Sequence, residues 1–426
     1  MKPSERKIQP PAMIARMPEL AGPDITFLPN GVPVCKIASG KEDIIRADFI
    51  FRAGQVFEKN HLTSSCVNMM LNEGSEDMTA EEVNRRLDFF GAVPNFFTEK
   101  DVAGLSIAFL SKHSRKIFGL CHDMLFKPVF PDEELRSLLK KRLQWHDVRQ
   151  ERVQSVANDL YFESVFGSSH PYGRVTHRED FSLLRRENLV EFHKRHYSPA
   201  NLSIVIAGNI TREAEECLAS VFGTLKAGRI SPAQEFSLPA YSSLPRIEKH
   251  KEGALQSAIR IGSATINKRN SDYPGLKVVD TLLGGYFGSR LMKNIREDKG
   301  YTYGIHSSVS SYDQSGYMLI STEVGSGYTE KAVSEIHHEI NRLATEPVGI
   351  KELDIVRNFM MGELVRMFDG PFATAESFRS AWEFGLGYDY FKKLAARIVS
   401  ITPDEIMHLA KTYYKQEYFV EVVVGP

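Results

Sequence analysis

The segment FHKRHYSPANLSIVIAG at residues 192–208 decides the fold, because it recurs near the end of the chain. There, residues 409–425 read LAKTYYKQEYFVEVVVG. Tyr197 lies 217 residues before Tyr414, and the closing glycines of the two copies share that offset. Each copy has the pattern of a helix end, a turn and a β-branched strand that stops at glycine. A supersecondary unit repeated at a fixed offset predicts tandem copies of one fold.

A second pair of similar segments supports the repeat. YFESVFGSSHPYG (161–173) and SAWEFGLGYDYF (380–391) both place Phe-Gly after an apolar helix. Between the halves lies a stretch dense in Gly, Pro and Ser, which is typical of a linker. We therefore predict a first domain at 25–222, a linker at 223–249 and a second domain at 250–426. Strands and helices alternate without a regular βαβ period, so the expected class is α+β, with mostly antiparallel sheet and helices on one side.

Composition excludes several classes of partner. The chain of 426 residues is 42% hydrophobic and 25% charged, with a formal net charge of −1. This balance gives no electrostatic basis for binding nucleic acid or an anionic membrane. No apolar run has the length of a signal peptide or a membrane span. The four cysteines are scattered, which favours free thiols in a reducing compartment. We expect a cytoplasmic protein, although a chain with its leader removed would look the same.

Helix signals are strongest in the first half. Residues 62–72 are dense in apolar side chains, and an acidic turn with glycine follows them. Thr79 and Glu82 form a capping box at the start of a second, amphipathic helix over 79–90. A single long helix is expected over 133–160.

These segments resemble the pitrilysin/insulinase family of zinc peptidases, in its shorter two-domain members. The resemblance rests on MLNEGS (70–75), AEEVNRRLDFFGA (80–92) and HPYGR (170–174) in the first half. In the second half it rests on LLGGYFGSRLMKNIREDKGYTYGIHS (282–307) and SFRSAWEFGLGYDYF (377–391). It implies two tandem copies of a pitrilysin/insulinase-like domain.

The family's zinc motif, H-x-x-E-H, is missing from the chain. Alignment on MLNEGS places Ser65 and Met69 at the histidine positions and Asn68 at the glutamate position. Asp147 falls at or near the position of the distal acidic ligand. A hydroxyl and a thioether are poor zinc ligands, and an amide cannot act as a general base. No other histidine pair has convincing zinc spacing, so we expect no metal in this chain.

The second half keeps a different part of the family's active site. The resemblance places its arginine–tyrosine pair on Arg296 and Tyr303, which would bind substrate and stabilise the oxyanion at a zinc site across a chamber. The alternative is that Arg296 is a surface residue at a helix end and Tyr303 a packed strand aromatic. Asn95 is a further candidate for substrate binding, on an edge strand where Pro94 removes one backbone donor.

The resemblance thus implies a non-metal-binding subunit of a heterodimeric zinc metallopeptidase that acts on peptides. Its partner would be a homologous subunit that carries H-x-x-E-H and the zinc. The alternative is a non-proteolytic structural or scaffold protein of the same fold. No nucleophile–base pair in the sequence supports other chemistry. Arg296 and Tyr303 separate the two readings, since a structural subunit has no need of them.

Overall fold

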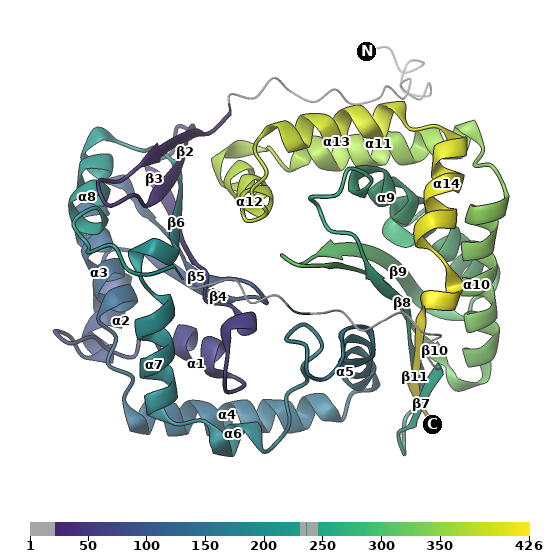
Figure 1. Cartoon of the computed structure of the whole chain (residues 1–426), viewed down its shortest axis with the longest axis horizontal. Coiled ribbons are helices and arrows are strands. Elements are labelled where there is room, and N and C mark those ends of the chain that lie inside the picture. Colours follow the sequence, from purple (N-terminus) through teal and green to yellow (C-terminus); the bar gives the residue numbers. More distant parts are fainter. Residues whose placement is uncertain (1–21, 231–235, 237–245) are drawn as a thin grey trace, which may run out of the picture.

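The computed structural model describes residues 22–230, Phe236 and residues 246–426. These residues form an α+β protein with two sheets, one in each half of the chain, surrounded by helices (Figure 1). Most of the predicted linker, at 231–235 and 237–245, lies outside the described residues. The second sheet begins with a strand at Arg246.

The first sheet has six strands in the order β1-β2-β6-β3-β5-β4. β2 and β6 are parallel, and the other neighbours are antiparallel. β3 and β6 are buried along nearly their whole length, which requires apolar cover on both faces of the sheet. The strands are β1 (Asp24–Phe27), β2 (Pro33–Ala38), β3 (Ile44–Phe51), β4 (Val93–Thr98), β5 (Ala103–Leu110) and β6 (Leu202–Gly208).

The second sheet repeats this topology in the order β7-β11-β8-β10-β9. Its parallel pair, β7 and β11, takes the place of β2 and β6, and its other neighbours are antiparallel. The strands of the two echoed segments, β6 and β11, therefore occupy equivalent positions, and the predicted α+β fold of two similar halves is confirmed. The strands are β7 (Arg246–His250), β8 (Gln256–Thr265), β9 (Thr302–Ser311), β10 (Gly316–Gly325) and β11 (Val420–Gly425).

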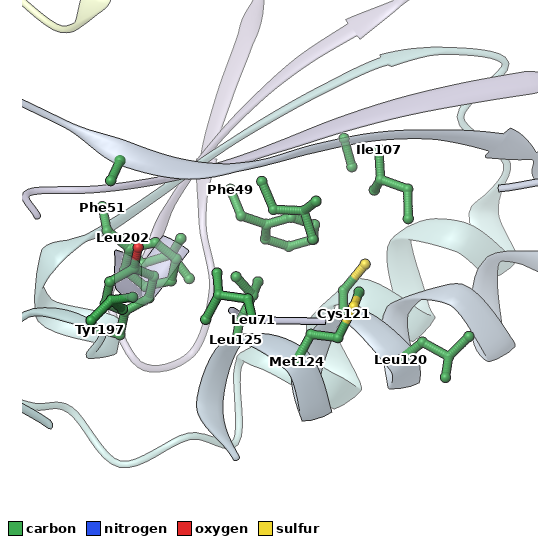
Figure 2. Packing of buried hydrophobic residues seen from close by; sticks show 14 of the residues in the cluster. Phe49, Phe51, Leu71, Ile107, Leu120, Cys121, Met124, Leu125, Tyr197 and Leu202 are labelled. Carbon is green, nitrogen blue, oxygen red and sulfur yellow. The ribbon is translucent and has the colours of Figure 1, made fainter. Parts of the chain in front are cut away.

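Helices of the first half pack on one face of its sheet. Figure 2 shows Leu120, Met124 and Leu125 beneath Phe49 and Ile107 of the strands. The predicted cap of the second helix is present, since the Thr79 side chain accepts from the Glu82 amide. The helices are α1 (Thr63–Met69), α2 (Ala80–Phe89), α3 (Ser114–Phe126), α4 (Asp132–Gln150), α5 (Val153–Phe166), α6 (Asp180–Leu183), α7 (Arg186–His196) and α8 (Arg212–Phe222).

Two π-helices distinguish the second half. They are η5 (Thr281–Gly285) and η6 (Met292–Asp298), and π-helical turns are rare and often lie at functional sites. No described helix is both long and apolar enough to cross a bilayer. The α-helices are α9 (Tyr273–Asp280), α10 (Thr329–Thr345), α11 (Ile350–Arg366), α12 (Gly370–Trp382), α13 (Asp389–Ser400) and α14 (Pro403–Tyr413).

The two halves exchange one helix each (Figure 1). The predicted single helix over 133–160 is wrong: α4 ends at Gln150, and α5 turns away to pack against β8 and β11 of the second sheet. There Tyr161 lies among Ala258 and Val422. In return, α12 packs against β2 and β6 of the first sheet. Each sheet is thus covered by its own helices on one face and by a helix of the other half on the opposite face.

Polar contacts also join the halves. The Tyr161 hydroxyl donates to the Met318 carbonyl within the buried interface. The Asp101 carboxylate accepts from the Tyr172 hydroxyl at 2.7 Å and from the Asp313 amide at 2.9 Å. Because these groups are shielded from water, leaving them without hydrogen-bond partners would lower the free energy of unfolding. The bonds therefore fix the position of one half relative to the other.

We predict that the two halves unfold together. Trp145 on α4 and Trp382 on α12 are the two tryptophans of the chain, so Trp382→Phe and Trp145→Phe each leave one reporter. Denaturant curves followed by the two reporters should coincide, because each sheet depends on the other half's helix. The substitution Phe378→Ala on α12 removes a ring that is buried among Cys35 and Val205. It should lower the free energy of unfolding measured by either tryptophan by about 3–5 kcal/mol.

The control is Phe27→Ala, whose side chain is 69% exposed and should have little effect. Two separate midpoints, or a Phe378→Ala effect confined to the Trp382 signal, would show that the exchange does not couple the halves.

Candidate functional site

Helix α1 carries the three positions that align with the zinc motif. Asn68 is buried, and its amide donates to the Gly104 carbonyl at 2.9 Å and to the Tyr197 hydroxyl at 3.3 Å. It therefore ties α1 to β5 and α7, which is a structural role. Met69 is 39% exposed and Ser65 half-buried. The helix begins after Leu62, whose φ of 70° is a strained value for a branched residue.

An arginine lies over this helix. Arg142 of α4 donates from Nη1 to the Ser65 hydroxyl at 2.8 Å and to the Cys66 sulfur at 3.0 Å. Burial raises the pKa of the Cys66 thiol, against the smaller opposing effect of Arg142. A guanidinium at this place repels a metal cation, and the described residues hold no group of three or more His, Cys, Asp or Glu placed to bind one. Zinc does not fit this site.

Asp147 faces away from that contact. Both of its carboxylate oxygens accept from Arg178, at 2.6 and 2.5 Å, in an exposed pair that holds the pKa of Asp147 below its usual range. Five helical residues separate Arg142 from Asp147, so the two side chains lie on different faces of α4. The α4 side chain that bonds to α1 is thus Arg142 and not the predicted acid. Sequence reasoning missed it because an arginine is not a metal ligand.

The π-helix η6 presents Arg296. Its half-buried guanidinium lies over the Phe287 ring, 4.6 Å from the centroid, and Phe287 is itself 63% exposed. No carboxylate of the described residues pairs with Arg296. A cation held by an aromatic face keeps its hydrogen-bond donors free for another partner. The sequence contained Phe287 within GGYFGS but gave no sign of this contact.

An anchor holds η6 against α10. The Asn294 amide donates to Glu335 at 3.0 Å and to the buried Glu339 at 2.7 Å. Lys299 pairs with Glu335 at the end of the same π-helix and holds the pKa of that carboxyl below its usual range. The backbone next to Arg296 is therefore fixed by hydrogen bonds and an ion pair to α10.

A β-bulge follows, at the start of β9. Tyr303 and Gly304 together face Glu323 of β10, so β9 holds one extra residue there. The Thr302 hydroxyl stabilises the bulge by donating to the Glu323 carbonyl at 2.7 Å and accepting from the Gly304 amide at 3.1 Å. Bulges re-aim side chains, and they are frequent beside active sites.

Tyr303 projects into solvent. Its side chain is 93% exposed, which excludes the alternative of a packed strand aromatic, and its hydroxyl has no hydrogen-bond partner among the described residues. Tyr301 lies before β9 and stacks on Tyr328 with ring centroids 4.9 Å apart. Strand alternation does not relate Tyr301 to Tyr303, because β9 begins after Tyr301 and the bulge interrupts the alternation. No direct bond joins Arg296 to Tyr303 within the described chain.

Asn95 lies on β4, the edge strand of the first sheet, as predicted for a peptide-binding strand. Its side chain is exposed, and within the described residues the outer edge of β4 makes no backbone hydrogen bond. Such an edge can pair with an extended chain. The equivalent edge strand β9 is covered, because the Val309 amide donates to Asp280 and its carbonyl accepts from Lys277.

Residues 184–360 match the family described as the peptidase M16 inactive domain. Relatives include an uncharacterized zinc protease of Bacillus subtilis, 24% identical over 70% of this chain and 72% of its own, and one of Rickettsia bellii, 23% identical over 91% and 90%.

Solved structures share the fold. The peptidase M16 inactive domain from Pseudomonas fluorescens superposes with a TM-score of 0.87 at 20% identity, over 95% of this chain and 98% of that one. A protease from Helicobacter pylori gives 0.88 at 16% identity, over 96% and 100%. This chain is therefore a homologue of the pitrilysin/insulinase (M16) peptidases that lacks the H-x-x-E-H motif.

Proposed function

We propose that this chain is the non-metal-binding subunit of a two-chain zinc metallopeptidase that acts on peptides. Its partner is a homologous chain with H-x-x-E-H, and this chain supplies Arg296 and Tyr303 to the partner's zinc site. The observation that carries the proposal is the exposure of Tyr303, in a half that also presents Arg296 without a carboxylate partner among the described residues. In the other half, Arg142 bonds to Ser65 at the position that aligns with the zinc motif.

The energetics of the surface support a role in trans. A phenol that is 93% exposed contributes little to the stability of its own chain, yet a bulge and an anchored π-helix hold the surrounding backbone. Exposed Tyr, Arg and Phe side chains are also the types that dominate binding surfaces. Relatives named zinc proteases supply the expected chemistry of the partner.

The proposed mechanism assigns one task to each residue. Attack on an amide carbonyl builds negative charge on its oxygen, and the Tyr303 hydroxyl donates a hydrogen bond to that oxygen as the charge develops. Arg296 donates to the peptide carbonyls and fixes the bound chain. The zinc of the partner would supply the activated water. Asn95 and the open edge of β4 offer a further backbone-pairing surface for extended peptide.

The first prediction of this proposal concerns metal. Purified alone, the chain should retain well under one equivalent of zinc after dialysis, measured by elemental analysis. Arg142→Met should leave this result unchanged, because Ser65, Asn68 and Met69 still supply no ligand set. Stoichiometric zinc that is lost in Ser65→Ala would contradict the assignment.

The second prediction concerns catalysis by the reconstituted pair. Alone the chain should not cleave peptides, and with its metal-bearing partner it should restore activity. Tyr303→Phe should lower kcat by about a hundredfold or more, since an oxyanion donor is lost. Arg296→Ala should raise KM and lower kcat together, because it contacts both the ground state and the transition state.

The controls are Tyr301→Phe, Ser65→Ala and Met69→Leu, which should leave activity nearly intact. Complex formation is followed in parallel by analytical ultracentrifugation. If Tyr303→Phe and Arg296→Ala both retain wild-type activity in an intact complex, the chain is a non-proteolytic scaffold of the same fold.

The third prediction concerns the anchor of η6. Asn294→Ala leaves Glu335 and Glu339 without their shared donor, so the backbone that carries Arg296 should relax. Activity of the pair should fall towards that of Arg296→Ala, with the melting temperature of the chain lowered only modestly. The matched control is Asn84→Ala on α2, an exposed residue whose amide donates to the Ala80 carbonyl of the same helix and accepts from half-buried Asn72. Equal effects of the two substitutions on kcat and KM would refute a positioning role for Asn294.

A further inference from the structure

A cavity of about 510 Å³ lies within the second half, away from Arg296 and Tyr303. It is open to solvent on one side and is lined by α9, α11, α13, the end of α12 and the far end of β9. Its volume falls in the range of small-molecule sites, roughly 300–1,000 Å³. The walls are mostly apolar and include Phe359, Met360, Leu364, Met367, Leu394 and Ile398.

The apolar lining reaches the surface of the molecule. Phe359 and Met367 line the cavity and are each 37% exposed, so large apolar side chains meet solvent there. Leu364 and Ile398, by contrast, are buried in the core behind them. An apolar space that continues from the core to a solvent-facing opening can take up an aliphatic chain.

One charged group in the wall, Lys268, is compensated without a salt bridge from the described residues. Glu383 and Glu99 act on its charge from farther away, and its ammonium lies over the Phe384 ring, 5.0 Å from the centroid. The Lys268 ammonium donates to the Ser380 carbonyl at 2.8 Å, and no carboxylate of the described residues lies within salt-bridge distance of it. Burial is the largest influence on the pKa of Lys268 and lowers it, while the charges of Glu383 and Glu99 act in the opposite direction. An ammonium has three donors, so two of them remain for a ligand.

The other charged groups of the cavity are already matched. Lys277 lies 3.7 Å from Asp280 and donates to the Val309 carbonyl at 3.2 Å. Glu363 pairs with Arg366. Lys268 is therefore the charged group of this wall that has hydrogen-bond donors available for an anionic ligand.

We propose that this cavity binds an aliphatic chain that ends in a carboxylate, with Lys268 as its counter-ion. The apolar wall takes the chain, and the ammonium bonds the carboxylate. Free fatty acids and peptides with an apolar C-terminal residue share this chemistry. The inference goes beyond the proposed peptidase role and does not depend on it, because the cavity belongs to this chain alone.

The test is calorimetric titration of the full chain with decanoate below its micellar concentration. We expect saturable binding of one molecule per chain, and clearly weaker binding of decanol, which lacks the charge. Lys268→Met keeps an apolar stem of similar length and should weaken decanoate at least about tenfold while leaving decanol nearly unchanged. A short peptide that ends in leucine, compared with its C-terminal amide, then shows whether a peptide carboxylate is accepted as well.

The matched control is Lys112→Met, an exposed lysine of the first half that should leave both affinities unchanged. Met360→Trp fills the cavity and should abolish binding of decanoate and decanol alike. Circular dichroism melting confirms that each variant is folded, and wild-type protein serves in every arm. Absence of saturable decanoate binding to the wild type would overturn the proposal. So would decanoate affinities of Lys268→Met and Met360→Trp that both equal the affinity of the wild type.

Discussion

The structure depends on the need of each sheet for apolar cover on both faces. β3 and β6 are buried on either side, and the helices of their own half cover one face alone. Helix α12 covers the other, and α5 does the same for the second sheet. Because this exchange is hydrophobic and reciprocal, neither half can move without exposing core surface. The surfaces that carry α1, β4, η6 and Tyr303 are thereby held at fixed relative positions.

The same constraint explains why α1 survives without metal ligands. Cys66 and Val67 are fully buried in the first core, and Asn68 bonds to β5 and α7. The helix is needed to fill the first core, whereas its face towards α4 does not have to be apolar. There Arg142 bonds to Ser65, which supplies a fixed positive charge and ties the two helices together. A polar bond thus replaces the link that a shared metal ion would make.

Much of this could be read from the sequence, and the limits have physical causes. The repeat that relates Tyr197 to Tyr414 predicted two similar halves, because a turn followed by a strand has a recognisable local sequence pattern. The path of α5 could not be predicted, since an apolar helix face does not reveal which sheet it covers. The exposure of Tyr303 depends on a bulge and on the start of β9, and neither has a clear local signal. The contact of Arg142 with α1 was not predicted, because a positively charged side chain is not a candidate metal ligand.

The two halves present different groups at equivalent places in the fold. The first retains an open strand edge at β4. The Arg142 guanidinium, however, lies over α1, where it would repel a metal ion. The second covers the equivalent edge of β9 with α9 and presents a phenol and an arginine to solvent instead. Within one chain these parts do not complete a zinc site, because Ser65, Asn68 and Met69 supply no ligand set for the ion. In the proposed complex another chain brings the metal, and the rigid exchange of helices presents Tyr303 to it without a folding cost at the moment of assembly.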